Sequence, residues 1–194
     1  MDKPVKKYVL LDRDGTIIVN KHYQKDPDET ELLPNAGEGL HLLRDAGFGL
    51  VLTTNQSGIG RGYLTRTDLA AVNRRMILEL GGDDRFFDGI YYCPHVEADG
   101  CRCRKPLPGL AELAAYELGF AMPECYVVGD REIDIGVGDA VGATTVLVRT
   151  GGGAAVEAAG TAKPDYVAED LLDTAKWIVQ REKWTQRVTR ELRR

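Results

Sequence analysis

Two closely spaced aspartates follow an apolar stretch near the beginning of the chain. Asp12 and Asp14 come directly after residues 8–11, and Gly15 and Thr16 follow them. A buried strand that ends this way presents both carboxylates at the carboxyl edge of a sheet, where open α/β folds bind ligands. Such a pair can bind a divalent cation, or one carboxylate can attack phosphorus while the other transfers a proton. The structural alternative is an acidic turn after a strand.

Three further polar segments lie at or beyond the ends of expected strands. Residues 53–58 form a polar, glycine-containing turn that can offer a hydroxyl and backbone N–H groups to a phosphate. Residues 104–106 place Lys105 near the same edge, and residues 129–134 begin with a strand that ends in Asp130. Each segment alone is typical of a polar loop or a surface lysine, but their order along the chain indicates one site at one sheet edge.

A second group of residues has the composition of a metal site. Cys93, His95, Cys101 and Cys103 lie within eleven residues. Three thiolates and one imidazole suit tetrahedral Zn²⁺, and because protein fills all four positions the ion would organise the loop rather than catalyse. A reduced, metal-free loop is the alternative. Cys125 lies in an expected strand, where it is typical of a small buried apolar residue.

Composition places the chain among ordinary globular proteins. Its 194 residues are 43% hydrophobic and 28% charged, with a net charge of −5, so no nucleic-acid partner is expected. No apolar stretch approaches the roughly 20 residues of a membrane span, so no membrane association is expected. The charged first residues are unlike a signal peptide, and the clustered cysteines favour a reducing compartment. We therefore expect a cytoplasmic protein.

Alternating apolar and amphipathic segments predict the fold class. The expected strands are residues 8–11, 49–53, 89–92, 125–128 and 145–148, and the expected helices are 35–46, 66–80, 108–119 and 132–141. This alternation predicts a three-layer α/β/α fold with a mainly parallel sheet and right-handed crossovers. Thr65 and Asp68 have the spacing of an N-terminal capping box, and Gly47 is placed to end the first helix.

Two later segments have less definite patterns. Residues 151–163 are rich in glycine and alanine, and we expect a flexible loop there. From about residue 169 to 194 the chain is basic and places Trp177 and Trp184 at helical spacing. We expect a terminal helix that packs its tryptophans on the domain, with a partner or nucleic-acid surface as the alternative. The whole chain, residues 1–194, is expected to form one domain.

The four segments together resemble a known superfamily. The order Asp-x-Asp-Gly-Thr, Thr-Asn-Gln-Ser-Gly, Lys-Pro and Gly-Asp-Arg-x-x-Asp is similar to the haloacid dehalogenase superfamily of phosphohydrolases, over roughly residues 8–170. The resemblance implies a Rossmann-like domain and an Mg²⁺-dependent mechanism with an aspartyl-phosphate intermediate. No interval between the segments is long enough for a separate cap domain, so the site should be open.

The resemblance also implies a role for each site residue. Asp12 would be the nucleophile, and Asp14 the general acid and then the base. Thr54 and Lys105 would hold the transferring phosphoryl oxygens. Asp130 would complete the Mg²⁺ site with Asp12 and the backbone carbonyl of Asp14.

The zinc loop narrows the resemblance to two families of phosphatases. The string Cys-Pro-His through Cys-x-Cys-Arg-Lys-Pro resembles phosphatases of heptose 1,7-bisphosphate, which remove the 7-phosphate, and phosphatases of histidinol phosphate. Residues 54–62, 88–95 and 147–151, together with Tyr23, favour the heptose family. The sequence at 20–22 departs from the heptose family, and the short zinc loop is nearer to the histidinol-phosphate family. Arg131 also resembles that family, although arginine fits either, so histidinol phosphate stays as the alternative. An acidic net charge argues against a polynucleotide 3′-phosphatase, and the full set of site residues against a non-catalytic zinc scaffold.

Candidate substrate-binding residues lie in the loops around this edge. They are Arg13, Asn20, Tyr23, Asn55, Gln56, Ser57, Arg61, Arg104 and Arg131. A bisphosphate needs a second anion site, for which Arg61, Arg104 and Lys21 are candidates because cations, and guanidinium groups above all, bind phosphate. The expected partner is a small phosphorylated metabolite, the expected cofactors are Mg²⁺ and Zn²⁺, and the expected state is a monomer.

Overall fold

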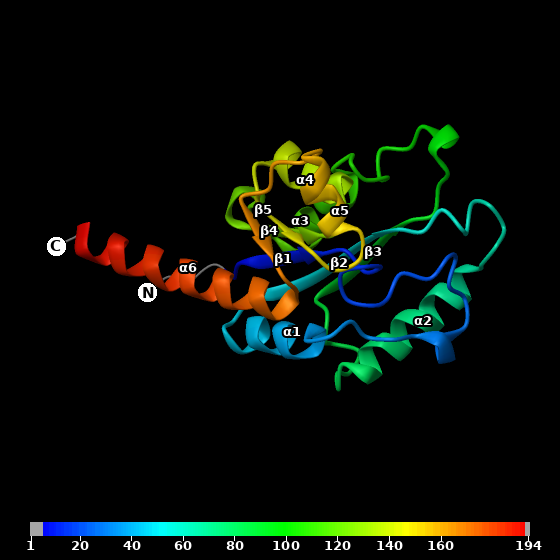
Figure 1. The fold of residues 1–194 in the computed structure, drawn as a ribbon, viewed down its shortest axis with the longest axis horizontal. Coiled ribbons are helices and arrows are strands. Elements are labelled where there is room, and N and C mark those ends of the chain that lie inside the picture. Colours follow the sequence, from blue (N-terminus) through cyan, green and yellow to red (C-terminus); the bar gives the residue numbers. More distant parts are fainter. Residues whose placement is uncertain (1–5, 193–194) are drawn as a thin grey trace.

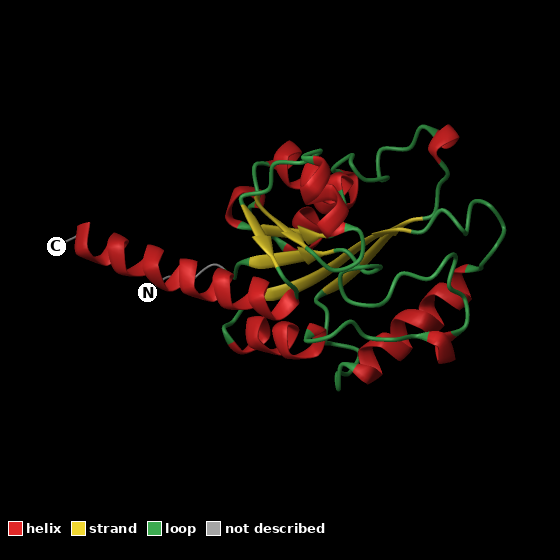
Figure 2. Ribbon diagram, in the orientation of Figure 1, coloured by secondary structure: helices red, strands yellow, loops and turns green. Residues whose placement is uncertain are grey.

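A computed structural model describes residues 6–192, and its centre is a six-stranded, fully parallel sheet (Figures 1 and 2). The spatial order is β3-β2-β1-β4-β5-β6. The strands are β1 (Tyr8–Leu11), β2 (Gly49–Asn55), β3 (Gly89–Cys93), β4 (Tyr126–Gly129), β5 (Thr144–Val148) and β6 (Tyr166–Ala168). Val9 and Leu11 pack into one core while Leu10 packs into a core on the other face, so β1 is buried on both sides.

Helices cover both faces of the sheet, so the predicted three-layer α/β/α architecture is confirmed (Figure 2). The helices are α1 (Ala36–Asp45), α2 (Arg66–Glu79), α3 (Gly109–Leu118), α4 (Glu132–Val141), α5 (Gly153–Ala159) and α6 (Leu171–Leu192). Short 3₁₀ turns are η1 (Pro27–Glu29), η2 (Glu97–Asp99) and η3 (Met122–Glu124). Helices α1, α2 and α6 lie on one face, and α3, α4 and α5 on the other (Figure 1).

The capping box predicted at the start of α2 is present. The Thr65 hydroxyl accepts a hydrogen bond from the N–H of Asp68 at 3.1 Å, and the Asp68 carboxylate accepts one from the N–H of Thr65 at 2.7 Å. These bonds satisfy backbone donors that the first helical turn leaves free, so the helix begins at a defined residue.

The prediction of a flexible loop over residues 151–163 is wrong. Residues Gly153–Ala159 form α5, which ends at Gly160 with φ of 61°. The three glycines at 151–153 suggested a loop, but the alanines that follow are strong helix formers. Val156 then packs on Ile135 and Leu147, and this tertiary contact stabilises a helix too short to be stable alone.

Helix α6 is 22 residues long and projects beyond the domain (Figure 1). The helix is tied to the sheet as far as Glu182, which accepts hydrogen bonds from Lys7 at 2.8 Å and from the Tyr126 hydroxyl at 2.7 Å. Trp177 stacks on Tyr166, but Trp184 is 61% exposed, so the prediction that both tryptophans pack on the domain is wrong for the second. Within residues 6–192, no helix has the length and apolar character needed to cross a bilayer.

The strand order determines where the polar segments meet. Strand β1 lies between β2 and β4, so the residues that follow these three strands share one edge of the sheet. The connection after β1 leads to β2 and the connection after β4 leads to β5 on the opposite side, which creates the crevice where open α/β folds bind ligands.

Candidate active site

Lys105 lies at the centre of a buried cluster of charged groups. Its Nζ donates to Oδ1 of Asp12 at 2.6 Å, to Oδ1 of Asp134 at 2.6 Å and to the Thr53 carbonyl at 2.9 Å. Burial alone would lower the pKa of Lys105, but the two carboxylates outweigh it and raise the pKa. The lysine therefore stays protonated and provides a fixed positive charge beside Asp12.

Three carboxylates of this cluster could hold a cation. One oxygen from each of Asp12, Asp130 and Asp134 lies within 4.8 Å of the others. Burial raises the pKa of Asp12, although Lys105 opposes the change. Burial also raises the pKa of Asp130 to about 6, although the Gly152 N–H opposes that change.

The environment of Asp130 fits a bound divalent ion. Its Oδ2 accepts from the Gly152 N–H at 2.7 Å, whereas its Oδ1 is buried and has no hydrogen-bond partner within residues 6–192. An unpaired buried carboxylate oxygen is costly, and a hard cation with oxygen ligands such as Mg²⁺ would satisfy it. The residues present therefore fit the magnesium site that the sequence predicts.

The glycine of the Asp-x-Asp-Gly-Thr segment is required by close packing in this site. Gly15 has φ of 86°, a conformation that residues with a Cβ rarely adopt. A Cβ at this position would lie 2.3 Å from Oδ2 of Asp130. Glycine thus allows the loop after β1 to approach the carboxylate after β4.

Asp14 lies in a cleft beside these residues, but its carboxylate is not one of the three that could hold the cation. It accepts hydrogen bonds from Arg13 and, at 2.9 Å, from Nε2 of Gln56, which also donates to the Thr54 hydroxyl at 3.0 Å. The cation ligand predicted from Asp14 is its backbone carbonyl, so this orientation of the side chain is compatible with that prediction.

Arg13 lines the cleft, but its guanidinium is already hydrogen-bonded within the protein. It was predicted to bind substrate, but its residue is only 1% exposed and its guanidinium is bonded to Asp14 and to Asn73 of α2. The guanidinium is therefore engaged inside the protein, behind the carboxylate of Asp14.

The side-chain amide of Asn55 is hydrogen-bonded to the backbone of Lys105. Its Nδ2 donates to the Lys105 carbonyl at 3.1 Å, and its Oδ1 accepts from the Lys105 N–H at 3.0 Å. Both ends of the amide are thus used to hold the lysine segment against the end of β2.

The cleft beside the cluster has a volume of about 250 Å³. Of the predicted substrate-binding residues, the ones that line it are Arg13, Asn20, Tyr23, Asn55, Gln56, Ser57 and Arg131. Lys21 also lines it, and its Nζ donates to the Glu29 carbonyl. Arg61 and Arg104 lie outside this lining, and Arg104 reaches the His95 carbonyl at 3.5 Å. Lys105 lines the cleft and comes two residues after Cys103, so the cleft and the zinc loop are adjacent.

Sequence reasoning did not assign a role to Asp134. Asp134 belongs to the polar segment 129–134. Its carboxylate accepts hydrogen bonds from Nζ of Lys105 and, at 3.1 Å, from the N–H of Arg131. The signal was its spacing, four residues after Asp130 and three after Arg131, the residue just before the helical pattern. That spacing is typical of a capping box and also turns the side chain back toward the strand end.

The four predicted zinc ligands converge. Cys93 Sγ lies 3.6 Å from Cys101 Sγ and 3.3 Å from Cys103 Sγ, and His95 Nδ1 lies 3.2 Å from Cys103 Sγ. A Zn–S bond of about 2.3 Å puts tetrahedral ligand atoms about 3.5–3.8 Å apart. These residues therefore fit a structural zinc ion. Cys125 is buried apart from them and donates to the Ala121 carbonyl.

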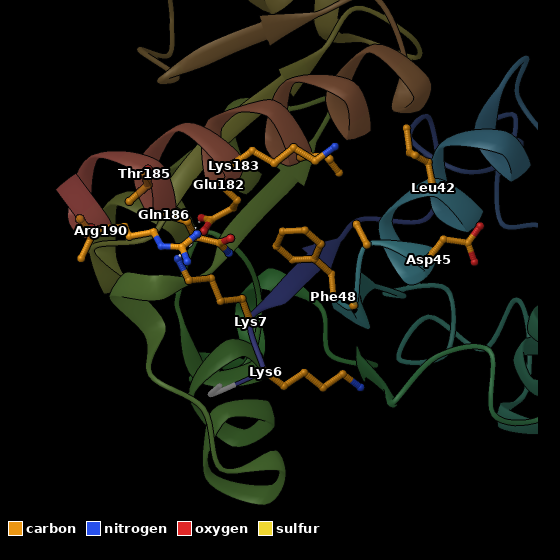
Figure 3. A pocket seen from close by; sticks show the side chains of 14 residues that line it. Lys6, Lys7, Leu42, Asp45, Phe48, Glu182, Lys183, Thr185, Gln186 and Arg190 are labelled. Carbon is orange, nitrogen blue, oxygen red and sulfur yellow. Dashed lines mark hydrogen bonds and ion pairs between the residues drawn. The ribbon is translucent and has the colours of Figure 1, made fainter. Parts of the chain in front are cut away.

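A larger hollow of about 1180 Å³ lies at the other end of the sheet, between α1, the start of β1 and α6 (Figure 3). The charged groups Lys7 and Glu182 in it are paired with each other. Neither potential metal cluster found in the described part of the chain lies there. Size alone therefore does not identify the site, because the chemistry is in the smaller cleft.

Known proteins resemble this chain in sequence and structure. A model of the HAD-hydrolase-like family matches residues 102–174. D-glycero-β-D-manno-heptose-1,7-bisphosphate 7-phosphatase of Haemophilus ducreyi is 39% identical over 181 residues, covering 89% of this chain and 98% of the relative. The enzyme of the same name from Escherichia coli is 37% identical over 187 residues, covering 92% and 96%.

A solved structure agrees with these relatives. The D,D-heptose 1,7-bisphosphate phosphatase of B. bronchiseptica, complexed with magnesium and phosphate, superposes with a TM-score of 0.84 at 35% identity, covering 90% of this chain and 99% of the other. Identity of this extent over nearly the whole of each relative shows common descent. The chain belongs to the D-glycero-β-D-manno-heptose-1,7-bisphosphate 7-phosphatase family of haloacid dehalogenase-like hydrolases.

Proposed function

We propose that the protein is a phosphoric monoester hydrolase that removes the 7-phosphate of D-glycero-β-D-manno-heptose 1,7-bisphosphate. The observation that carries the proposal is the buried group of Asp12, Lys105 and Asp134 beside an unpaired oxygen of Asp130. The relatives' shared name supports the choice of substrate and of its β anomer. The reaction supports the synthesis of nucleotide-activated heptose.

Asp12 attacks the phosphorus of the 7-phosphate, and the bond from phosphorus to the sugar oxygen breaks. The released oxygen takes a proton from Asp14. Asp14 then accepts a proton from the water that hydrolyses the aspartyl phosphate. Lys105 and Thr54 hold the phosphoryl oxygens, and the positive charge of Lys105 offsets the repulsion between phosphate and carboxylate.

Magnesium would be held by Asp12, Asp130 and the backbone carbonyl of Asp14, next to Asp134. When bound, it neutralises negative charge on the phosphoryl group. Asp134 has both carboxylate oxygens in hydrogen bonds, so it orients Lys105 rather than competing for the ion.

The second phosphate of the substrate needs cations beyond the catalytic cluster. Lys21 and Arg131 line the cleft, and Arg61 and Arg104 extend from the segments beside it. We propose that some of these four bind the 1-phosphate, because it carries negative charge that the cluster around Asp12 cannot reach. The enzyme would act as a cytoplasmic monomer, in a compartment that keeps the zinc-loop thiols reduced.

The test compares specificity constants for heptose 1,7-bisphosphate and histidinol phosphate in the presence of Mg²⁺. We expect the heptose substrate to be preferred by at least about tenfold, a difference of about 1.4 kcal/mol. Phosphorus NMR should show release from C7 with the 1-phosphate retained. Preference for histidinol phosphate, or release from C1, would contradict the substrate assignment.

The nucleophile is tested separately with Asp12→Asn. Loss of a nucleophile should reduce turnover by more than about 10³-fold while the circular dichroism spectrum stays unchanged. Appreciable residual turnover would remove Asp12 from the nucleophilic role without affecting the substrate assignment.

A further inference from the structure

A continuous line of hydrogen bonds joins helix α2 to the carboxylate of Asp14. Oδ1 of Asn73 accepts from Nη1 of Arg13 at 2.8 Å. The other side of the same guanidinium donates to Asp14, from Nε to Oδ2 and from Nη2 to Oδ1, both at 3.1 Å. Asn73 is 6% exposed and does not line the cleft, so the line runs from the floor of the cleft at Asp14 into the protein interior.

The position of Asn73 is otherwise suited to an apolar residue. Its neighbours on the buried face of α2 are Leu69, Val72, Met76 and Ile77. Placing a polar amide and a guanidinium in such surroundings costs free energy unless both are hydrogen-bonded. The bonds between Asn73, Arg13 and Asp14 satisfy several of these groups, and they also connect the polar pair directly to the active site.

Asn73 determines the orientation of the guanidinium plane. An arginine side chain has several rotatable bonds, and a bidentate pair with a carboxylate needs the two planes to match. Asp14 alone fixes one edge of the group. The bond from Nη1 to Asn73 fixes the far side, so the fork is preorganised before any substrate binds.

This arrangement selects one position on Asp14 for a transferable proton. A carboxylate has about four acceptor positions on its two oxygens. Arg13 fills one on each oxygen, and Gln56 fills the second on Oδ2. The remaining position is on Oδ1, and the Asp14 side chain keeps 18% of its surface exposed at the cleft.

We propose that Asn73 is a positioning residue that acts through Arg13 to hold the carboxyl of Asp14 in the orientation needed for proton transfer to the leaving oxygen. The proposal rests on the proposed phosphatase function and assigns Arg13 to this line rather than to substrate. In the step concerned, the bond from Asp12 to phosphorus forms and the bond from phosphorus to the leaving oxygen breaks. The electron pair goes to that oxygen, which takes the proton from Asp14.

The test uses leaving groups that differ in their need for a proton. A sugar alkoxide is a poor leaving group and depends on the acid, whereas p-nitrophenolate leaves with little assistance. Asn73→Leu keeps the side-chain size but removes the acceptor. We expect kcat/KM for heptose bisphosphate to fall by about tenfold or more, and kcat/KM for p-nitrophenyl phosphate to change by less than about twofold.

Two matched variants complete the experiment. Asn73→Asp keeps an acceptor at the same place and should restore most of the lost activity. Arg74→Ala, at the next, exposed position of α2, should leave both specificity constants unchanged.

Three outcomes would overturn the proposal: an equal fall with both substrates, no fall with either, or no recovery in Asn73→Asp. A purely structural role for Asn73 predicts the equal fall, because fewer folded molecules lower both rates together. If the wild-type enzyme hydrolyses a different alkyl phosphate, that substrate replaces heptose bisphosphate in the comparison with p-nitrophenyl phosphate. Failure of the substrate assignment and failure of this proposal are therefore distinguishable.

Discussion

The side-chain amide of Asn55 is hydrogen-bonded to both the N–H and the carbonyl of Lys105, fifty residues further along the chain. This pairing joins the end of β2 to the segment that leaves the zinc loop. Because it acts on the backbone, it sets where the Lys105 side chain starts and so where its Nζ meets Asp12.

Replacing Asn55 should therefore impair catalysis without unfolding the protein. In Asn55→Ala the lysine segment loses both bonds, and a displacement of about 1 Å can cost on the order of 10²-fold in kcat. The measurement is steady-state phosphate release. Asn55→Ala combined with Lys105→Met should be no slower than Lys105→Met alone, because both changes remove the same interaction. Additive losses would show that Asn55 has a separate role.

Asp134 provides a second test of how Lys105 is held. Asp134→Asn leaves the side-chain shape but removes the negative charge that accepts from Lys105 at 2.6 Å. Residues that orient a catalytic group typically contribute about 10–100-fold, so kcat should fall within that range. Asp139→Asn, on the exposed face of the same helix, is the matched control and should be as active as the wild type. Equal activity of the two variants would contradict the assigned role.

Removal of zinc should loosen the segment that carries Arg104 and Lys105. A chelator selective for zinc, used with Mg²⁺ in excess, should release about one zinc per chain and lower both the melting temperature and kcat. Re-added Zn²⁺ should restore both, and added Mg²⁺ should not.

The cysteines allow a matched pair for this experiment. Cys101→Ala should lose the metal, whereas Cys125→Ala should retain it because this buried cysteine lies apart from the four clustered ligands. Retention of zinc by Cys101→Ala would show that the four predicted ligands do not form the site.

The stabilising effect of Mg²⁺ should grow with pH. Burial raises the pKa of Asp130 from its ordinary value of 3.8 to about 6, so the folded state binds a proton more tightly than the unfolded state. Without the metal, the contribution of Asp130 to stability is therefore greatest below the unfolded pKa and is lost as pH rises through about 6, on the order of 3 kcal/mol for such a shift. Mg²⁺ binds the ionised form and offsets this cost.

Thermal unfolding with and without Mg²⁺ at about pH 5 and about pH 7.5 checks this expectation. The increase in melting temperature caused by the metal should be larger at the higher pH. Asp130→Asn should remove most of that difference, because the amide does not titrate. An increase of the same size at both pH values would contradict the assignment of Asp130 to the cation site.

Local patterns in the sequence predicted much of the fold. The expected strand at residues 8–11 has the observed bounds, and the helices expected at 66–80 and 132–141 match within a residue. These elements were predictable because strand burial, helix periodicity and caps depend on residues close together in the chain. The error at α5 has the opposite cause, since packing of Val156 on α4 and β5 stabilises that helix.

The residue types that carry out the chemistry could also be identified from the sequence. Carboxylates directly after apolar strands and a Cys-x-His plus Cys-x-Cys loop limit the reactions and metals that the protein can support. The tertiary structure alone decided how these groups are held. It placed Lys105 between Asp12 and Asp134, Asn55 on the lysine backbone, and Arg13 between Asp14 and Asn73. These contacts join residues on different elements, and no local pattern encodes them, because a side chain's partners depend on which elements pack together.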